Sequence, residues 1–228
     1  MRRNSIGGGC FDNTPLGATL AHIWRNRKVL NVGLGMICGT VAGNALTVWS
    51  PSFLIRVHGY TLQQAGFAAA MVVGLVGAVG AVIGGSLSDR LARNDPGRRM
   101  LTCIVGPLLS AVALWGACFV ESGQLALALL ALTVFLIQFM YGPGYAAILS
   151  LTPAGMRGTT MSAYLIATNF IAVNVGTMSA GWLADVLKPR YGAHSIAVAL
   201  AGLGVFNLLA ALFFWRAMAL MKRDGLAA

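Results

Sequence analysis

The stretch Gly84-Gly85-Ser86-Leu87-Ser88-Asp89-Arg90-Leu91-Ala92-Arg93 decides the fold class, because a long apolar run ends in it with one acid and two arginines. The preceding residues 65–88 contain no ionisable side chain. A short basic turn, Asn94-Asp95-Pro96-Gly97-Arg98-Arg99, follows and leads into another apolar run. This pattern predicts a membrane helix, a cytoplasmic loop and a second membrane helix.

Glycines recur at helical spacing inside two of the apolar runs. Gly77, Gly80 and Gly84 leave a flat strip on one face of the helix that ends at Asp89, and Gly35-x-x-x-Gly39-x-x-x-Gly43 does the same earlier in the chain. Such strips allow a neighbouring helix to approach closely. A phosphate-binding loop is disfavoured, because these glycines lie within apolar helices and follow no strand.

The composition indicates an integral membrane protein, with 57% hydrophobic and only 10% charged residues. The net charge of +10 could indicate nucleic-acid binding, but the basic residues lie in short segments between apolar runs. A membrane surface is therefore the favoured partner, and no nucleic acid is expected. Four cysteines, Cys10, Cys38, Cys103 and Cys118, lack metal-ligand spacing and predict neither a metal site nor a disulfide framework.

Runs long enough to cross about 30 Å of hydrocarbon need about 20 apolar residues. We expect six such spans, at 29–55, 63–88, 100–120, 124–150, 159–187 and 195–220. In the fourth span, Gly142-Pro143-Gly144 predicts a kink or break. The spans divide the chain into a cytoplasmic segment 1–28, a transmembrane domain 29–220 and a cytoplasmic tail 221–228.

The basic residues predict the orientation in the membrane. If the amino terminus is cytoplasmic, 13 of the 16 Lys and Arg lie on the inner side, and only Arg56, Lys188 and Arg190 remain outside. Arg2 and Arg3 are not followed by the apolar core of a signal peptide. We therefore expect a multi-pass protein of the cell membrane, in a bacterium the inner membrane, with both termini in the cytoplasm.

Every Asp, Glu and His lies in a loop or at the end of a span. The spans thus carry no proton-carrying group at the bilayer midplane, where coupled transporters usually place one. They also lack a His-Glu-x-x-His pair, paired aspartates, or a serine with a histidine at compatible depth. We therefore predict no catalytic residue, no cofactor and no metal, and we do not expect an enzyme.

Asp89 stands at the carboxyl end of its helix, where the helix dipole destabilises a carboxylate by about 0.3–1 kcal/mol. Arg90 and Arg93 are close enough in sequence to compensate. Arg157 presents the converse problem near the amino end of the fifth span and predicts an anionic partner. The loop either only enforces topology or forms a charge latch that favours one conformation.

A short sequence repeat links the second and fifth spans. Gly85-Ser-Leu87-Ser-Asp89 ends one, and Gly181-Trp-Leu183-Ala-Asp185 ends the other, 96 residues later. Three spans separate the two motifs, so they lie on opposite sides of the membrane. A repeat with inverted topology produces this arrangement.

Several motifs resemble those of the major facilitator superfamily. Gly85-x-Leu87-x-Asp89-Arg90-x-x-Arg93 resembles the loop motif between the second and third helices of each half, and Pro153-x-x-x-Arg157-Gly158 resembles the loop before the fifth. The stretch Trp49-Ser-Pro51-Ser-Phe53-Leu54-x-Arg56-x-x-Gly59-Tyr60, followed by Ala65-Gly66, is similar to the Spinster-like branch. The resemblance covers residues from about 16 to 220.

The resemblance implies an all-α membrane protein with six transmembrane helices arranged as a 3+3 inverted repeat, which is the carboxyl-terminal half of a twelve-helix secondary transporter. Residues 1–28 would match the central linker. Such a half moves a small organic or amphiphilic solute by alternating access and requires a second half, either an amino-terminal half or a homodimer partner. Two departures from the family pattern are Ala92, in place of a glycine, and Ser150, in place of an acid.

The resemblance also assigns site residues. The cytoplasmic gate would contain Gly85, Asp89, Arg90, Arg93 and Arg157, and the cavity would be lined by Asn44, Gln138, Tyr141, Tyr145 and, less centrally, Asn169. Each cavity candidate could instead form a helix-to-helix hydrogen bond, worth about 0.6 kcal/mol. The alternative function is a membrane scaffold or remnant that binds a partner through its glycine-rich faces without transporting anything.

Overall fold

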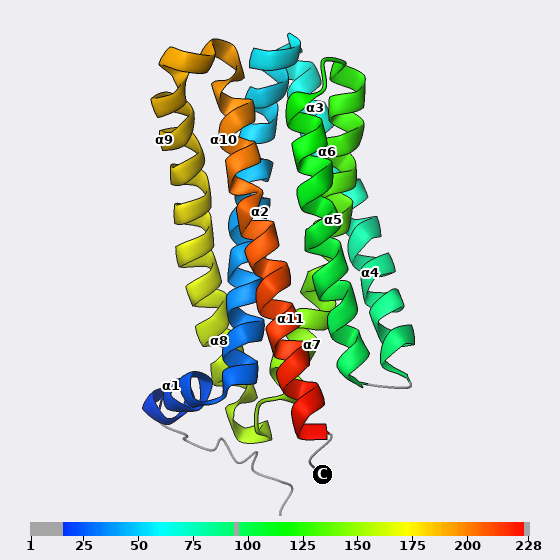
Figure 1. Ribbon diagram of the computed structural model, residues 1–228, viewed down its shortest axis with the longest axis vertical. Helices are drawn as coiled ribbons and strands as arrows, with labels where there is room; N and C mark the ends of the chain where they lie inside the picture. Colours follow the sequence, from blue (N-terminus) through cyan, green and yellow to red (C-terminus); the bar gives the residue numbers. More distant parts are fainter. Residues whose placement is uncertain (1–15, 94–95, 226–228) are drawn as a thin grey trace, which may run out of the picture.

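The computed structural model describes residues 16–93 and 96–225, which form a bundle of long helices with a short helix lying across one end (Figure 1). The α-helices are α1 Leu16–Arg25, α2 Arg27–His58, α3 Leu62–Met71, α4 Gly77–Ala92, α5 Arg99–Phe119, α6 Gly123–Ile137, α7 Tyr141–Ser150, α8 Arg157–Ala167, α9 Asn174–Tyr191, α10 Ser195–Leu203 and α11 Val205–Gly225. Arg2, Arg3, Cys10, Asn94 and Asp95 lie outside the described residues.

Shorter helical turns join these elements: η1 Val72–Val76, η2 Pro96–Arg98, η3 Gln138–Met140, η4 Ala154–Met156, η5 Thr168–Val173 and η6 Gly192–His194. Of these, η1 and η5 are π-helical and continue the long helices around them. They begin 96 residues apart, at Val72 and Thr168, which is the spacing of the two sequence motifs.

The described helices form six segments that run along the bundle, which we call legs. In chain order they are α2; α3, η1 and α4; α5; α6, η3 and α7; α8, η5 and α9; and α10 with α11. Within residues 16–93 and 96–225, five stretches are long and apolar enough to cross a membrane, and the last of them, Ala154–Arg223, is 70 residues long. A straight helix of that length would span about 105 Å. It turns back at Gly192, whose φ of 55° places it in the left-handed region, so it forms two legs. The six legs match the six predicted spans, each with slightly different ends.

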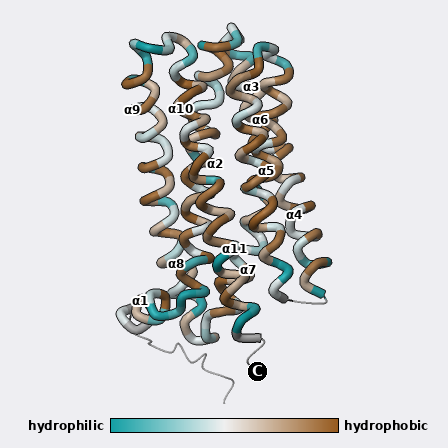
Figure 2. Tube along the Cα trace, in the orientation of Figure 1, coloured by the Kyte–Doolittle hydropathy of each residue, from teal (hydrophilic) through white to brown (hydrophobic). Residues whose placement is uncertain are grey.

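The hydropathy of the legs follows their place in the bundle. Apolar residues occupy most of their length and hydrophilic residues gather toward the two ends (Figure 2). One end carries α1 and the carboxyl terminus, and we call it the α1 end (Figure 1). The other end, which we call the far end, contains the turns after α2 and α9.

Local sequence signals close the helices where the legs turn. Gly59 ends α2 with φ 69°, and its amide donates to the carbonyls of Leu54 and Ile55. Thr61 then opens α3 with a capping box, in which its side chain accepts from the Gln64 amide and the Gln64 side chain accepts from the Thr61 amide.

The predicted glycine strips are packing faces. A Cβ at Gly80 would lie 2.5 Å from the Phe135 carbonyl oxygen, and one at Gly84 would lie 2.6 Å from the Phe139 Cα. The second and fourth legs therefore approach through their backbones. Gly35 likewise packs against the Phe214 ring from α11. The prediction that both strips allow close helix packing is confirmed.

The predicted break in the fourth leg is confirmed at η3. Pro143 has no amide hydrogen, and its ring crowds the carbonyl of Phe139, four residues earlier. The chain accordingly narrows to a 3-10 turn over Gln138–Met140 before α7 begins at Tyr141. Gln138 and Tyr141 flank this break, about halfway along the span Gly123–Ser150.

Buried polar contacts tie the legs together. Asn207 donates to the Ser110 hydroxyl at 3.4 Å, and Ser110 donates to the Thr133 carbonyl at 3.2 Å. The Trp49 indole reaches from α2 to the Thr177 carbonyl at 3.0 Å. Asn207, polar in the predicted sixth span, thus has a structural role as a link between α11 and α5.

Candidate functional site

A polar pocket of about 100 Å³ lies in the middle of the bundle, between α2, η1 and the break in the fourth leg. Its lining consists of Gly43, Asn44, Leu46, Thr47, Val73, Val134, Ile137, Gln138 and Tyr141. Three of the five predicted cavity residues, Asn44, Gln138 and Tyr141, therefore meet at one place although they come from two legs.

The amide side chains of this pocket use their donors on backbone carbonyls. Asn44 donates to the Thr40 carbonyl at 3.1 Å, one turn back in α2. Gln138 donates across to the Gly77 carbonyl of α4 at 3.4 Å. Their side-chain oxygens remain as acceptors beside the pocket, and the Tyr141 phenol adds a hydroxyl. The pocket is therefore lined by neutral hydrogen-bonding groups.

Tyrosines continue from the pocket toward the α1 end. Tyr141 stacks on Tyr145 with ring centroids 6.2 Å apart, and Tyr145 meets the Tyr164 ring edge-on at 5.9 Å. Tyr145 does not line the polar pocket, because it lies one helical turn beyond Tyr141. It connects the pocket to α8, and aromatic pairs at such distances stabilise helix contacts.

Asn169 lies apart from the other predicted cavity residues. It belongs to η5, is exposed, and donates to the Leu165 carbonyl at 2.8 Å within its own leg. The structure therefore does not bring Asn169 into the polar pocket.

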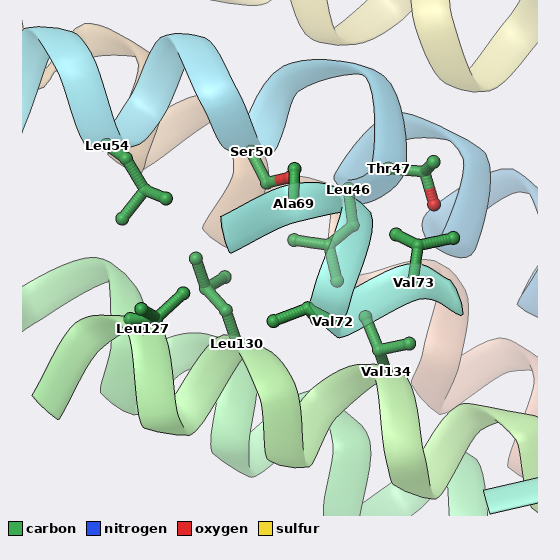
Figure 3. A pocket seen from close by; sticks show the side chains of 10 residues that line it. All are labelled: Leu46, Thr47, Ser50, Leu54, Ala69, Val72, Val73, Leu127, Leu130 and Val134. Carbon is green, nitrogen blue, oxygen red and sulfur yellow. The ribbon is translucent and has the colours of Figure 1, made fainter. Parts of the chain in front are cut away.

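A narrow apolar pocket continues the polar one toward the far end. It shares Leu46, Thr47, Val73 and Val134 with its neighbour and is otherwise lined by Ser50, Leu54, Ala69, Val72, Leu127 and Leu130. Figure 3 shows these side chains of α2, the second leg and α6 converging, with the Ser50 and Thr47 hydroxyls among aliphatic groups. A solute in the polar pocket would thus have an apolar wall on one side.

The predicted gate has a different ion pair from the one expected. Asp89 is exposed and lies 3.5 Å from a terminal nitrogen of Arg99, at the start of α5. Arg90 and Arg93, the cations expected to compensate Asp89, are both exposed near the end of α4. Helix α5 packs alongside α4, which brings Arg99 to Asp89.

The other gate candidates lie near the same end of the bundle. Gly85 lies beside Gly142, where a Cβ would be 3.8 Å from the Gly85 Cα. The Arg157 guanidinium donates to the carbonyl of Thr152, in the turn after α7, at 3.2 Å. This neutral carbonyl is the contact found for it, where an anionic partner was predicted.

Three residues that the sequence analysis did not assign belong to these sites. Thr47 lines both pockets and lies three residues after Asn44, so helical spacing could have identified it. Arg99 pairs with Asp89, and Tyr164 contacts Tyr145 from another leg. These two contacts depend on tertiary folding and leave no local signal. Among the described residues, no group of three His, Cys, Asp or Glu could hold a metal ion.

The bundle of apolar legs and its charged loop are typical of a multi-pass membrane protein. Residues 5–176 match the sequence profile of the Major Facilitator Superfamily. This match covers most of the chain, which therefore belongs to that superfamily. The family resemblance seen in the loop motifs is confirmed.

Relatives of the chain are named as transporters. It is 32% identical over 204 residues to an "MFS-type efflux pump" of Mycolicibacterium smegmatis, covering 89% of this chain and 47% of the relative. It is 30% identical over 127 residues to the "Probable galactarate/D-glucarate transporter GudP" of Bacillus subtilis, covering 54% of this chain and 26% of the relative.

A solved structure confirms the fold. The crystal structure of a bacterial homologue of the human lysosomal transporter Spinster, inward-facing and unoccupied, superposes with a TM-score of 0.80 at 17% identity. The superposition covers 98% of this chain and 54% of the homologue. The chain thus spans about half the length of the transporter structure and of the efflux pump it matches.

Proposed function

We propose that the chain is one half of a secondary active transporter that moves a small organic or amphiphilic solute by alternating access. The observation that carries this proposal is the polar pocket at the break of the fourth leg, within a chain that spans half of its relatives. A solute that crosses between two halves needs a wall from each. The second wall would come from an amino-terminal half or from a second copy.

The lining favours a neutral or amphiphilic solute over a diacid. Asn44, Gln138 and Tyr141 offer hydrogen bonds without charge, and the adjoining pocket is apolar. A dicarboxylate such as galactarate would need cationic partners to offset its desolvation, and this wall holds none. The efflux-pump relative therefore suggests the better analogy for the solute than the sugar-acid transporter relative.

The gate and the repeat complete the proposal. The contacts of Asp89 with Arg99 and of Arg157 with the Thr152 carbonyl would hold the α1 end in one conformation. Gly85, Arg90 and Arg93 would complete that gate. The equal 96-residue spacing of the π-helical segments and of the sequence motifs supports an inverted 3+3 repeat. The concentration of basic residues at the α1 end supports cytoplasmic termini.

Flux into proteoliposomes tests the proposal. The chain is reconstituted alone and with a co-expressed second half, and uptake of a neutral amphiphile is compared with uptake of galactarate. We expect flux of the amphiphile only in the assembled form. The variant Asn44→Leu/Gln138→Leu should lose it, whereas the exposed control Asn169→Leu should retain most of it. Equal flux in the pocket variant and the wild type would contradict the assigned cavity, and no flux in any assembly would favour the scaffold.

A further inference from the structure

A second groove lies at the α1 end of the bundle. It has a volume of about 320 Å³, within the range of about 300–1,000 Å³ that ligand pockets occupy. Its walls are α1, α2, α8 and η5, with Ile148 of α7. The polar pocket also has α2 and the fourth leg as walls. The groove and the polar pocket therefore lie along the same path between the middle of the bundle and its α1 end.

One face of α2 runs from the groove to the polar pocket. Gly33 and Ile37 line the groove, and Asn44 lines the pocket. At about 3.6 residues per turn, Asn44 lies on the same face as Ile37, about 10 Å further along the helix. The two sites are thus close enough for one solute molecule to occupy both.

Three tyrosine rings link the two sites. Tyr141 lines the polar pocket and Tyr164 lines the groove. Tyr145 contacts both, with its ring centroid 6.2 Å from that of Tyr141 and 5.9 Å from that of Tyr164. Each tyrosine presents an apolar ring with a polar tip, which suits a molecule that is polar at one end and apolar at the other.

The groove offers a solute an apolar surface. Among its lining residues only Thr160 and Tyr164 carry a side-chain oxygen, and none is charged. Both hydroxyl oxygens are buried, so a molecule in the groove cannot reach them. A polar group would lose its hydration here without gaining a hydrogen bond, whereas an alkyl chain would gain from leaving water.

The narrow apolar pocket on the other side of the polar pocket is too small for an alkyl chain. Its volume of about 10 Å³ is the room that about one water molecule needs, as against about 320 Å³ for the groove. Within this wall, the alkyl part of a bound amphiphile therefore has room only toward the α1 end.

We propose that the groove is a second solute subsite, which holds the alkyl chain of an amphiphile whose polar group lies at Asn44, Gln138 and Tyr141. The proposal rests on the transport function proposed above and narrows its solute class. The solute would be a neutral polar group joined to an alkyl chain, extended along α2 from the polar pocket to Gly33.

Photolabelling of the assembled transporter in proteoliposomes tests the proposal, with two forms of one neutral alkyl glycoside. One form carries a diazirine at the end of its alkyl chain, and the other carries it beside the sugar. We expect the chain-end probe to label α2 between Leu30 and Ile37. The sugar-end probe should label the segment from Gln138 to Tyr141, and an excess of the unmodified glycoside should remove both labels.

The variant Gly33→Phe separates the groove from the polar pocket. A Cβ at Gly33 meets nothing within 4 Å, so the new ring can enter the groove without displacing the chain. This variant should lose the chain-end label and keep the sugar-end label. Gly66→Phe, at a glycine that is equally open but lies in α3, is the matched control and should keep both labels.

Four results would overturn the subsite. One is a chain-end label in Gly33→Phe equal to that of the wild type. Another is a chain-end label that excess glycoside does not remove, which would assign the groove to membrane lipid. Flux of the glycoside in the wild type without chain-end labelling of α2 would overturn the subsite and leave the transport function standing. Absence of flux and of both labels would overturn the two together.

Discussion

Replacing Gly80 by alanine should destabilise the bundle although it adds a single methyl group. The new Cβ would lie 2.5 Å from the Phe135 carbonyl oxygen, 3.1 Å from its Cα and 3.2 Å from its carbonyl carbon. All three neighbours are backbone atoms of α6, so no side-chain rotation can relieve the contact. The second and fourth legs would have to move apart.

The expected loss follows from the cost of overpacking, about 1–3 kcal/mol. In a chain of this size, 1 kcal/mol shifts the melting temperature by about 2–4 °C, so Gly80→Ala should lower it by about 2–12 °C. The matched control is Gly66→Ala in α3, where a Cβ meets nothing within 4 Å. There, alanine should leave stability unchanged or raise it by about 0.5–1 kcal/mol.

Thermal unfolding of the purified chain in a mild detergent, followed by circular dichroism, measures both variants against the wild type. Because the two substitutions add the same group to a helix, their difference isolates the close contact with Phe135. Equal melting temperatures for Gly80→Ala and Gly66→Ala would refute the inference that the second and fourth legs touch through their backbones.

Three further predictions concern the gate, the cysteines and the orientation. Asp89→Asn should reduce flux in the assembled transporter yet change stability by less than about 1 kcal/mol, because the Asp89 side chain is 77% exposed. Unchanged uptake kinetics would exclude a gating role. In the native protein, maleimide should react with Cys38, which is half-buried, and not with Cys103 or Cys118, which are 0% and 5% exposed. Denaturation should make all three thiols react. Rapid labelling of Cys103 in the native protein would contradict the packing of α5. In intact cells lacking other reactive thiols, an impermeant maleimide should label Gln124→Cys at the far end and spare Arg93→Cys, and the reverse pattern would invert the proposed topology.

Much of the bundle could be predicted from the sequence because the membrane imposes simple rules. The six spans follow from apolar length, and the close contacts at Gly80 and Gly84 follow from helical spacing. The break at η3 follows from Pro143. These features depend on local composition, which a single sequence contains.

The candidate site could be predicted only in part. Asn44, Gln138 and Tyr141 line one pocket, whereas Asn169 does not line it and donates to the Leu165 carbonyl within its own leg. The pairing of Asp89 with Arg99 depends on how α4 and α5 pack against each other, which the local sequence does not specify.

Helix α1 was also missed. Six of its ten residues are apolar, but the segment is far too short to span a membrane, and so it was assigned to the linker. It is stabilised by packing on α2 and α8.

The mass of the particle extracted in a mild detergent tests the central claim most directly. The claim is that these six legs form one half of a two-half transporter, so native mass spectrometry after gentle cross-linking should find the chain joined to a second six-helix unit. That unit would be either another copy or a separate half. A strictly monomeric chain with no partner would contradict the claim.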